Sequence, residues 1–299
     1  MILGGLWLLW ALFAWKDRRE RHHLDVLLHR PLLAIKHLRA GLSALLGQQL
    51  RVMGIFFVLP VYLQVVLGFD AFETGKKLVP LSIAMLLAAL AGPKLAARFA
   101  PRPVVQTGFV AMAFAALLLA GTVDVELNER GFSFALAVFG AGAGLLMSQL
   151  GNVIMSSAPP EETNEASGLQ GTAQNLGASL GTALIGSVLL AGLLTGFTTR
   201  IRENPALSPS TVTQLEAATE QGIEIITTDQ AYATLIDAGV SPAEAGAVTA
   251  DYGEAQIEAL KKALFAVAIL ALGCLWFTRN LPKHPLTSGA SEPEPEPSG

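Results

Sequence analysis

Long stretches without a charged residue constrain this chain more than any other feature. Residues 166–199 contain no Asp, Glu, Lys or Arg over 34 positions, and residues 103–123 and 132–155 are free of charge over 21 and 24 positions. A helix needs about 20 apolar residues, at about 1.5 Å rise each, to cross the hydrocarbon layer of a bilayer. Only 15% of the 299 residues are charged and 52% are hydrophobic. The sequence therefore predicts an all-α integral membrane protein that lies in a lipid bilayer.

The same reasoning divides the chain into about seven transmembrane helices and the segments between them. The first crossing, at 1–15, is too short and is expected to be the truncated start of a helix in a chain with more helices upstream, with a complete seven-helix protein as the alternative. The remaining expected segments, in chain order, are a basic cytoplasmic loop with an amphipathic part at 16–42, five crossings within 43–193 (about 43–69, 75–97, 103–123, 132–155 and 166–193), an acidic extracytoplasmic loop with short helices at 194–257, the last crossing at 258–278, and a disordered cytoplasmic tail at 279–299.

The distribution of basic residues predicts the orientation in the membrane. Residues 16–39 hold seven Lys and Arg, residues 94–102 hold three and the tail holds two, whereas the opposite side holds seven. Loops rich in Lys and Arg stay in the cytoplasm. With seven crossings this places the N-terminus outside and the C-terminus in the cytoplasm of a multi-pass protein of the cell membrane.

Several function classes are excluded by what the sequence lacks. Twenty basic against 24 acidic residues, with no basic face, argue against a nucleic-acid partner. Cys274 is the only cysteine, so neither an internal disulfide nor a thiol-based metal site can form. Four histidines lie in the first loop without the carboxylate spacing of a metal site (His22, His23, His29 and His37). We therefore expect no metal, no cofactor, no catalytic residues and no enzymatic activity.

The acidic loop contains signals for helix ends. Thr213-x-x-Glu216 and Ser241-Pro242-Ala243-Glu244 have the pattern of capping boxes, the second with proline at the first helical position. Gly239 is a natural stop for a helix over about 229–238. Two or three short helices are predicted, and a lid or solvated cap is favoured over an enzymatic domain.

Polar side chains inside the predicted crossings are the candidate functional residues, because a polar group in hydrocarbon needs a partner or a water-filled cavity. An amide can either join two helices or line a substrate path, and the sequence leaves both open. Arg51 is placed at the membrane interface if its helix begins at Val52, and about 10 Å deep if it begins near Ser43. Pro60 is expected to kink its helix. The substrate-path candidates are Gln48, Gln49, Arg51, Gln64, Gln149, Asn152, Gln170, Gln174 and Asn175.

Glycines at helical spacing predict close contacts between helices. Gly140 and Gly144 share one face of the fifth expected crossing, and Gly177 and Gly181 share one face of the sixth. Small residues four apart let two helix backbones approach each other within a membrane. These four glycines are predicted to be helix-packing positions. Gln170 and Gln174 lie on the same stripe and are expected to face a central cavity.

Residues 57–68 read FVLPVYLQVVLG and are followed by ETG at 73–75 and LVPL at 78–81. These motifs resemble those of the C-terminal half of a Major Facilitator Superfamily transporter, most closely the fourteen-helix drug:proton antiporters. Residues 92–103, GPKLAARFAPRP, resemble a basic cytoplasmic turn, and PPEE at 159–162 before ASGLQGTAQNLGASLG at 166–181 resembles the entry to the penultimate helix. The turn departs from the family at Ala97 and Ala100, where an aspartate and a glycine are usual.

The resemblance implies a helical bundle that is half of a secondary transporter for multidrug efflux. It implies proton-coupled antiport of small amphipathic molecules or drugs, with an N-terminal transporter half as partner and the family's eighth to fourteenth helices in this chain. A seven-helix receptor or sensor is the alternative class. A retinal pigment needs a lysine deep in the last helix, yet Lys261 and Lys262 lie at its outer end.

Overall fold

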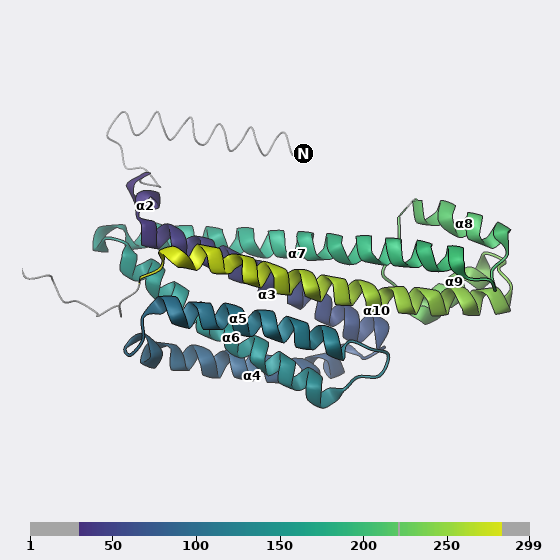
Figure 1. Ribbon diagram of the computed structural model, residues 1–299, viewed down its shortest axis with the longest axis horizontal. Coiled ribbons are helices and arrows are strands. Elements are labelled where there is room, and N and C mark those ends of the chain that lie inside the picture. The colour runs from purple at the N-terminus through teal and green to yellow at the C-terminus, as the bar shows by residue number, and fades with distance from the viewer. Residues whose placement is uncertain (1–29, 221, 283–299) are drawn as a thin grey trace, which may run out of the picture.

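The computed structural model describes residues 30–220 and 222–282, and every regular element in this part of the chain is a helix (Figure 1). The predicted crossing at 1–15 and most of the predicted basic loop and tail lie outside the described residues. The elements are α2 (Arg30–Ala34), α3 (Lys36–Pro60), the π-helix η1 (Val61–Val66), α4 (Ala71–Ala96), α5 (Pro101–Thr122), α6 (Glu129–Ser157), the short 3₁₀ helix η2 (Pro160–Glu162), α7 (Thr163–Glu203), α8 (Pro209–Glu220), α9 (Thr228–Asp237), α10 (Pro242–Gly273) and the 3₁₀ helix η3 (Cys274–Asn280).

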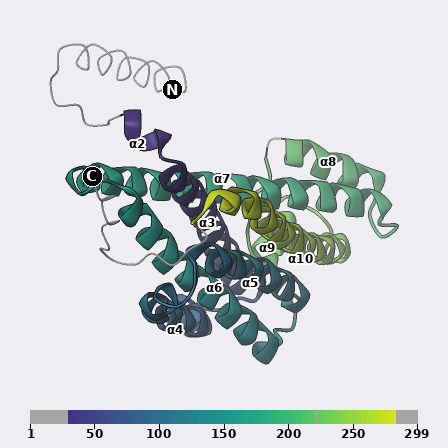
Figure 2. The same ribbon diagram turned by 60° about the vertical axis from the view of Figure 1, so that its left-hand side comes forward.

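Six of these helical stretches are long and apolar enough to cross a membrane. They are α3 with η1, α4, α5, α6, η2 with α7, and α10 with η3. They pack side by side as one bundle in which α3 contacts α6, α7 and α10. Figure 2 shows α4 at the outer edge of the bundle beside α6, with α8 and α9 at the opposite side. The predicted all-α class of a membrane bundle is confirmed.

Helix α3 begins earlier than the sequence suggested. Its first residue is Lys36, not a residue near Ser43, because Leu38 and Leu42 are already buried in the bundle and Gly41 packs against Ile154 of α6. Proline lacks the backbone N–H that would continue the ladder of hydrogen bonds. The irregularity expected at Pro60 takes the form of the π-helical turns of η1, which follow it directly.

Capping explains where α4 and α9 begin. The Asp70 side chain accepts a hydrogen bond from the Glu73 backbone N–H at 2.7 Å, and the Glu73 side chain bonds back to the Asp70 N–H. Thr227 and Gln230 form the same reciprocal box at the start of α9. Each box supplies hydrogen-bond acceptors to two backbone N–H groups that have no partner within the helix. Helix α9 ends before Gly239, whose φ of 83° is the left-handed conformation that favours glycine.

Helices α7 and α10 extend well past the crossings predicted at 166–193 and 258–278. The 41 residues of α7 span about 60 Å at helical rise, about twice the hydrocarbon thickness. The extension is held by pairing, since Arg200 forms ion pairs with Glu254 and Glu258. The segment predicted as the loop at 194–257 therefore contains the ends of these two long helices, and residues 204–241 connect them.

We call the extended end the head: the end of α7 from Phe197, all of α8 and α9, and α10 as far as Tyr252 (Figure 1). The predicted capping box at Thr213 is wrong, because α8 begins at Pro209 and the Thr213 hydroxyl donates to the Pro209 carbonyl. The predicted cap at Ser241 is correct. Its hydroxyl oxygen accepts from the Glu244 N–H, and Pro242 is the first helical residue.

Candidate substrate-path surface

Two glycines bring α7 into backbone contact with α3. A Cβ atom added to Gly177 would lie 2.4 Å from the Leu46 carbonyl oxygen, and one added to Gly181 would lie 2.1 Å from the Leu50 carbonyl oxygen. Real Cβ atoms do not approach backbone atoms this closely, so a larger residue would push the helices apart. The sixth expected crossing thus contacts its neighbour through the glycine face.

The same arrangement joins α6 to α4. A Cβ atom added to Gly140 would lie 2.2 Å from the Leu81 carbonyl oxygen, and one added to Gly144 would lie 2.1 Å from that of Met85. Lys77 of α4 also forms an ion pair with Glu129 at the start of α6. All four predicted packing glycines therefore lie in helix contacts where only glycine fits.

Two of the candidate amides lie buried between helices. Gln48 of α3 donates from Nε2 to the Ala143 carbonyl of α6 at 3.0 Å, and Gln149 of α6 donates to the Gly92 carbonyl of α4 at 2.9 Å. Both side chains are at most 1% exposed. Such bonds contribute about 0.6–2 kcal/mol each in a membrane. The sequence left two roles open for such amides, connecting two helices or lining a substrate path. The geometry of Gln48 and Gln149 fits the first role.

Arg51 lies inside the bundle. It stands 15 residues into α3, about 22 Å from the helix start at helical rise, and it is fully buried. The sequence placed Arg51 at the membrane interface on the condition that its helix begins at Val52, and the helix instead begins at Lys36. The guanidinium Nη1 donates to the Leu270 carbonyl at 3.0 Å, and Cζ lies 4.3 Å from the centre of the Phe109 ring. Its Nε and Nη2 atoms have no hydrogen-bond partner.

The six other candidates lie nearer the surface of the bundle. Gln49, Gln170 and Gln174 are half-buried, whereas Gln64, Asn152 and Asn175 are exposed. Gln49 sits against the glycine face of α7, since its Cβ is 3.0 Å from the position of a Cβ at Gly177. The structure thus separates the nine candidates into a buried set that joins helices α3, α4, α5, α6 and α10, and an outer set on α3, η1, α6 and α7.

The outer surface of α7 carries a polar edge that includes the predicted candidate Asn175. Asn175, Ser179 and Thr182 recur at helical spacing and are all exposed, next to the exposed leucines 176, 180 and 184. The Ser179 hydroxyl donates to the Asn175 carbonyl at 2.9 Å, and the Thr182 hydroxyl donates to the Ala178 carbonyl at 3.2 Å. With their protons used within the helix, both hydroxyl oxygens are left as acceptors. We call residues Asn175, Ser179 and Thr182 the polar edge of α7.

Glu244 is a carboxylate of the head that accepts several hydrogen bonds. It lies in the first turn of α10, beyond the charge-free part of that helix. Its carboxylate accepts from the Ser208 backbone N–H at 2.9 Å, from the Ser241 hydroxyl at 2.9 Å and from the Thr211 hydroxyl at 3.1 Å. The bond from the Ser208 N–H and the hydroxyl bonds that follow lower the pKa of Glu244 to about 2. Glu244 thereby ties the start of α8 to α10. Its capping role was predicted, but its partners in α8 are remote in sequence.

Within residues 30–220 and 222–282, no group of three His, Cys, Asp or Glu side chains that could hold a metal ion is present. His37 instead lies beside η3, with Nδ1 2.9 Å from the Asn280 carbonyl oxygen. His22, His23 and His29 lie outside the described residues. Among the described residues, the buried polar side chains of the bundle include the amides of Gln48 and Gln149 and the guanidinium of Arg51.

Known proteins similar to this chain include an efflux pump, an export protein and a transporter. The chain is 29% identical over 184 residues to the multidrug efflux pump LfrA of Mycolicibacterium smegmatis, a match that covers 60% of this chain and 35% of the pump. It is 28% identical over 212 residues to the tetracenomycin C resistance and export protein of Streptomyces glaucescens, covering 70% and 39%. It is 39% identical over 136 residues to the uncharacterized transporter YebQ of Escherichia coli, covering 44% and 28%.

The chain spans about a third of the length of the curated relatives it matches. The profile of the Major Facilitator Superfamily matches residues 1–182, which is more than half of the 299 residues. This match covers α3 to α6 and the part of α7 that carries Gly177 and Gly181. It agrees with the all-helical bundle, and the chain belongs to the Major Facilitator Superfamily.

Proposed function

We propose that this chain is one half of a secondary transporter that exports small amphipathic molecules. The observation that carries the proposal is the family match, together with relatives named for multidrug efflux and for antibiotic resistance and export. It favours transport over the receptor or sensor alternative. Members of this class move a solute by rocking two helical halves around a site near the midplane, so we infer that no covalent chemistry is catalysed.

The proposed path runs along the polar edge of α7. Hydroxyl and amide oxygens at Asn175, Ser179 and Thr182 are hydrogen-bond acceptors, and the leucines beside them offer apolar contact. A molecule with an apolar body and N–H donors suits this combination. Gln170 and Gln174 belong to the same helix and Gln49 of α3 lies against it, and these three are proposed to contact the solute. Gln48, Gln149 and Arg51 are proposed to act through the packing of the bundle.

The second half of the transporter is proposed to face this edge. Support comes from the exposure of the edge and from the share of the relatives' length that the chain covers. We further propose coupling to protons, the cell membrane as location, and an orientation with the head outside. The orientation rests on the excess of basic residues in the segments 16–39 and 94–102. With Cys274 changed to Ala, a membrane-impermeant maleimide should label a cysteine at Thr228 from outside but not one at Ser157.

Export is tested in a bacterium whose own drug pumps have been deleted. The chain is made together with the N-terminal half of the LfrA pump, and accumulation of a fluorescent organic cation is followed with and without a protonophore. We expect reduced accumulation that the protonophore reverses, and no effect of either half alone. Unchanged accumulation, when cross-linking shows that the two halves have assembled in the membrane, would contradict the proposal.

A further inference from the structure

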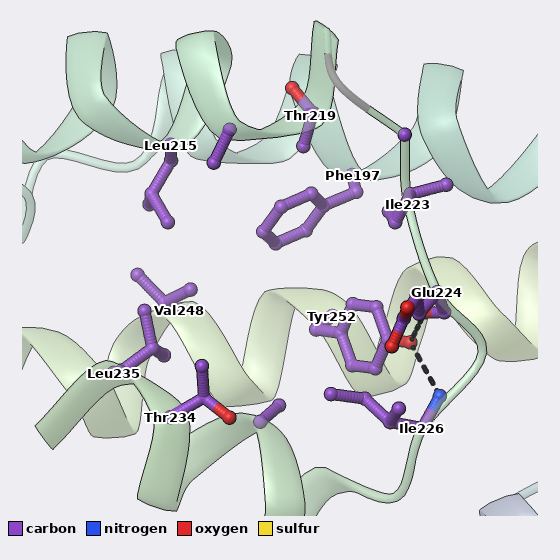
Figure 3. A pocket seen from close by; sticks show the side chains of 13 residues that line it. Phe197, Leu215, Thr219, Ile223, Glu224, Ile226, Thr234, Leu235, Val248 and Tyr252 are labelled. Carbon is purple, nitrogen blue, oxygen red and sulfur yellow. Dashed lines mark hydrogen bonds between the residues drawn. The ribbon is translucent and has the colours of Figure 1, made fainter. Parts of the chain in front are cut away.

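An apolar pocket opens in the head, away from the polar edge of α7 (Figure 3). Its volume is about 230 Å³. Its walls come from the end of α7, from α8 and α9, from the segment that connects α8 to α9, and from α10. The side chains that shape it include Phe197, Leu215, Ile226, Leu235, Val248 and Tyr252. A designed cavity of about 150 Å³ holds one benzene molecule, so this pocket has room for a group of one or two aromatic rings.

Aromatic side chains form one wall of the pocket and are fixed in place. The rings of Phe197 and Tyr252 meet edge to face, with centroids 5.6 Å apart and an angle of 89°. The Tyr252 hydroxyl donates to the Glu224 carbonyl at 2.6 Å and accepts from the Ile226 N–H at 3.1 Å. Because these bonds satisfy its polar end, Tyr252 presents its ring to the pocket (Figure 3).

The surroundings of the pocket are negatively charged. Residues 203–254 contain nine Asp and Glu and no Lys or Arg. Arg202 pairs with Glu216 and Arg200 pairs with Glu254, so two of these acids are neutralised. Glu224 is exposed and its side chain lies at the pocket, and in the part of the chain that the structure describes it has no ion-pair partner.

We propose that the head binds a small aromatic amine, with its ring or fused ring pair in the pocket and its ammonium group beside Glu224. The apolar walls exclude a strongly hydrated ligand, and the excess of acids disfavours an anion. The site is distinct from the proposed path along α7, and binding to it does not depend on transport. Its failure would leave the proposed function untouched.

Binding is measured by fluorescence polarisation on the chain in lipid nanodiscs, with protein-free nanodiscs as the blank. The probe is 1-naphthylmethylamine, and 1-naphthylacetate is the control with the same rings and the opposite charge. We expect the amine to bind at least tenfold more tightly than the acid. Glu224→Gln should remove most of this difference, whereas Asp237→Asn, an exposed acid of α9 outside the pocket, should leave it unchanged.

The position of the ring is tested by filling the pocket from two helices. Ala231→Trp on α9 and Ala218→Phe on α8 place bulk at lining positions and should each weaken binding of the amine at least tenfold. Ala233→Trp and Ala217→Phe are exposed controls on the same helices, outside the lining, and should bind like the parent. Equal binding of amine and acid, or equal effects of lining and control variants, would overturn the proposal. The second outcome would identify the signal as partition into lipid.

Discussion

At the scale of single residues, the bundle depends on positions where a helix backbone touches its neighbour. Gly177 and Gly181 meet carbonyl oxygens of α3, and Gly140 and Gly144 meet carbonyl oxygens of α4. Lipid tails are as apolar as leucine, so packing rather than hydrophobic burial holds such helices together. The identity of these residues was predictable from their spacing. Their partners were not, because spacing does not say which helix lies opposite.

Replacing Gly181 by Leu should therefore reduce the amount of folded protein in the membrane severalfold. The new side chain would meet the Leu50 backbone, and overpacking of this kind costs about 1–3 kcal/mol or more. Gly168→Leu is the matched control on the same helix, since nothing lies within 4 Å of a Cβ there. Membrane abundance of the two variants is compared by immunoblot. Equal loss in both would refute the packing role of Gly181.

Arg51 poses the opposite problem, a buried cation with few partners. It makes one hydrogen bond and one contact with the Phe109 ring, lies beside the Cys274 side chain, and leaves two nitrogen atoms without a hydrogen-bond partner. Replacing a poorly paired buried charge by an apolar side chain is often neutral or stabilising. The Leu270 carbonyl keeps a helical partner in the Cys274 N–H. The free energy of unfolding of Arg51→Met should thus lie within about 1 kcal/mol of that of the parent. Thermal unfolding of the two purified proteins checks this. A much larger loss of stability would show that the hydrogen bond to Leu270 and the contact with Phe109 outweigh the cost of burying the charge.

At the scale of elements, the sequence predicted which segments are helical better than where the helices end. Charge-free runs identify apolar helices because charges are costly in hydrocarbon. Helices α7 and α10 nevertheless continue through charged residues, because Arg200 pairs with acids of the facing helix and Phe197 packs on Tyr252. Neither contact is visible in a sequence that places these residues about 54 positions apart. The pocket in the head escaped prediction for the same reason.

The junction of α8 with α10 should respond to acid. The folded pKa of Glu244, about 2, is lower than its usual value of about 4.5, so its bonds stabilise the junction above pH 4.5 and are lost as the pH falls toward 2. A spin label on a cysteine at Thr213 of α8, in a Cys274→Ala background, should become more mobile over this range. In Glu244→Gln the spin label should be more mobile at neutral pH than in the parent, and its mobility should change less on acidification. A label equally immobile at pH 7 and pH 2.5 would exclude this role.

At the scale of the whole molecule, two outer surfaces of the bundle differ in character. Helix α4 exposes an apolar face that includes Val79, Ile83 and Leu86, as expected for contact with lipid. Helix α7 exposes the polar edge beside its leucines. A polar surface at membrane depth requires a partner or water. The difference supports a second transporter half opposite α7 and a water-filled path between the two.

Cysteine accessibility tests this account most directly. Single cysteines replace Asn175, Ser179 or Thr182 on α7, and Val79, Ile83 or Leu86 on α4, in a Cys274→Ala chain assembled with the second transporter half. A water-soluble maleimide should modify the α7 positions at least tenfold faster than the α4 positions, because only the thiolate formed in contact with water reacts. Excess amphipathic cation should slow the reaction on α7 alone. Equally slow modification of both helices would mean that the polar edge faces no aqueous path, and would contradict the proposed transport route.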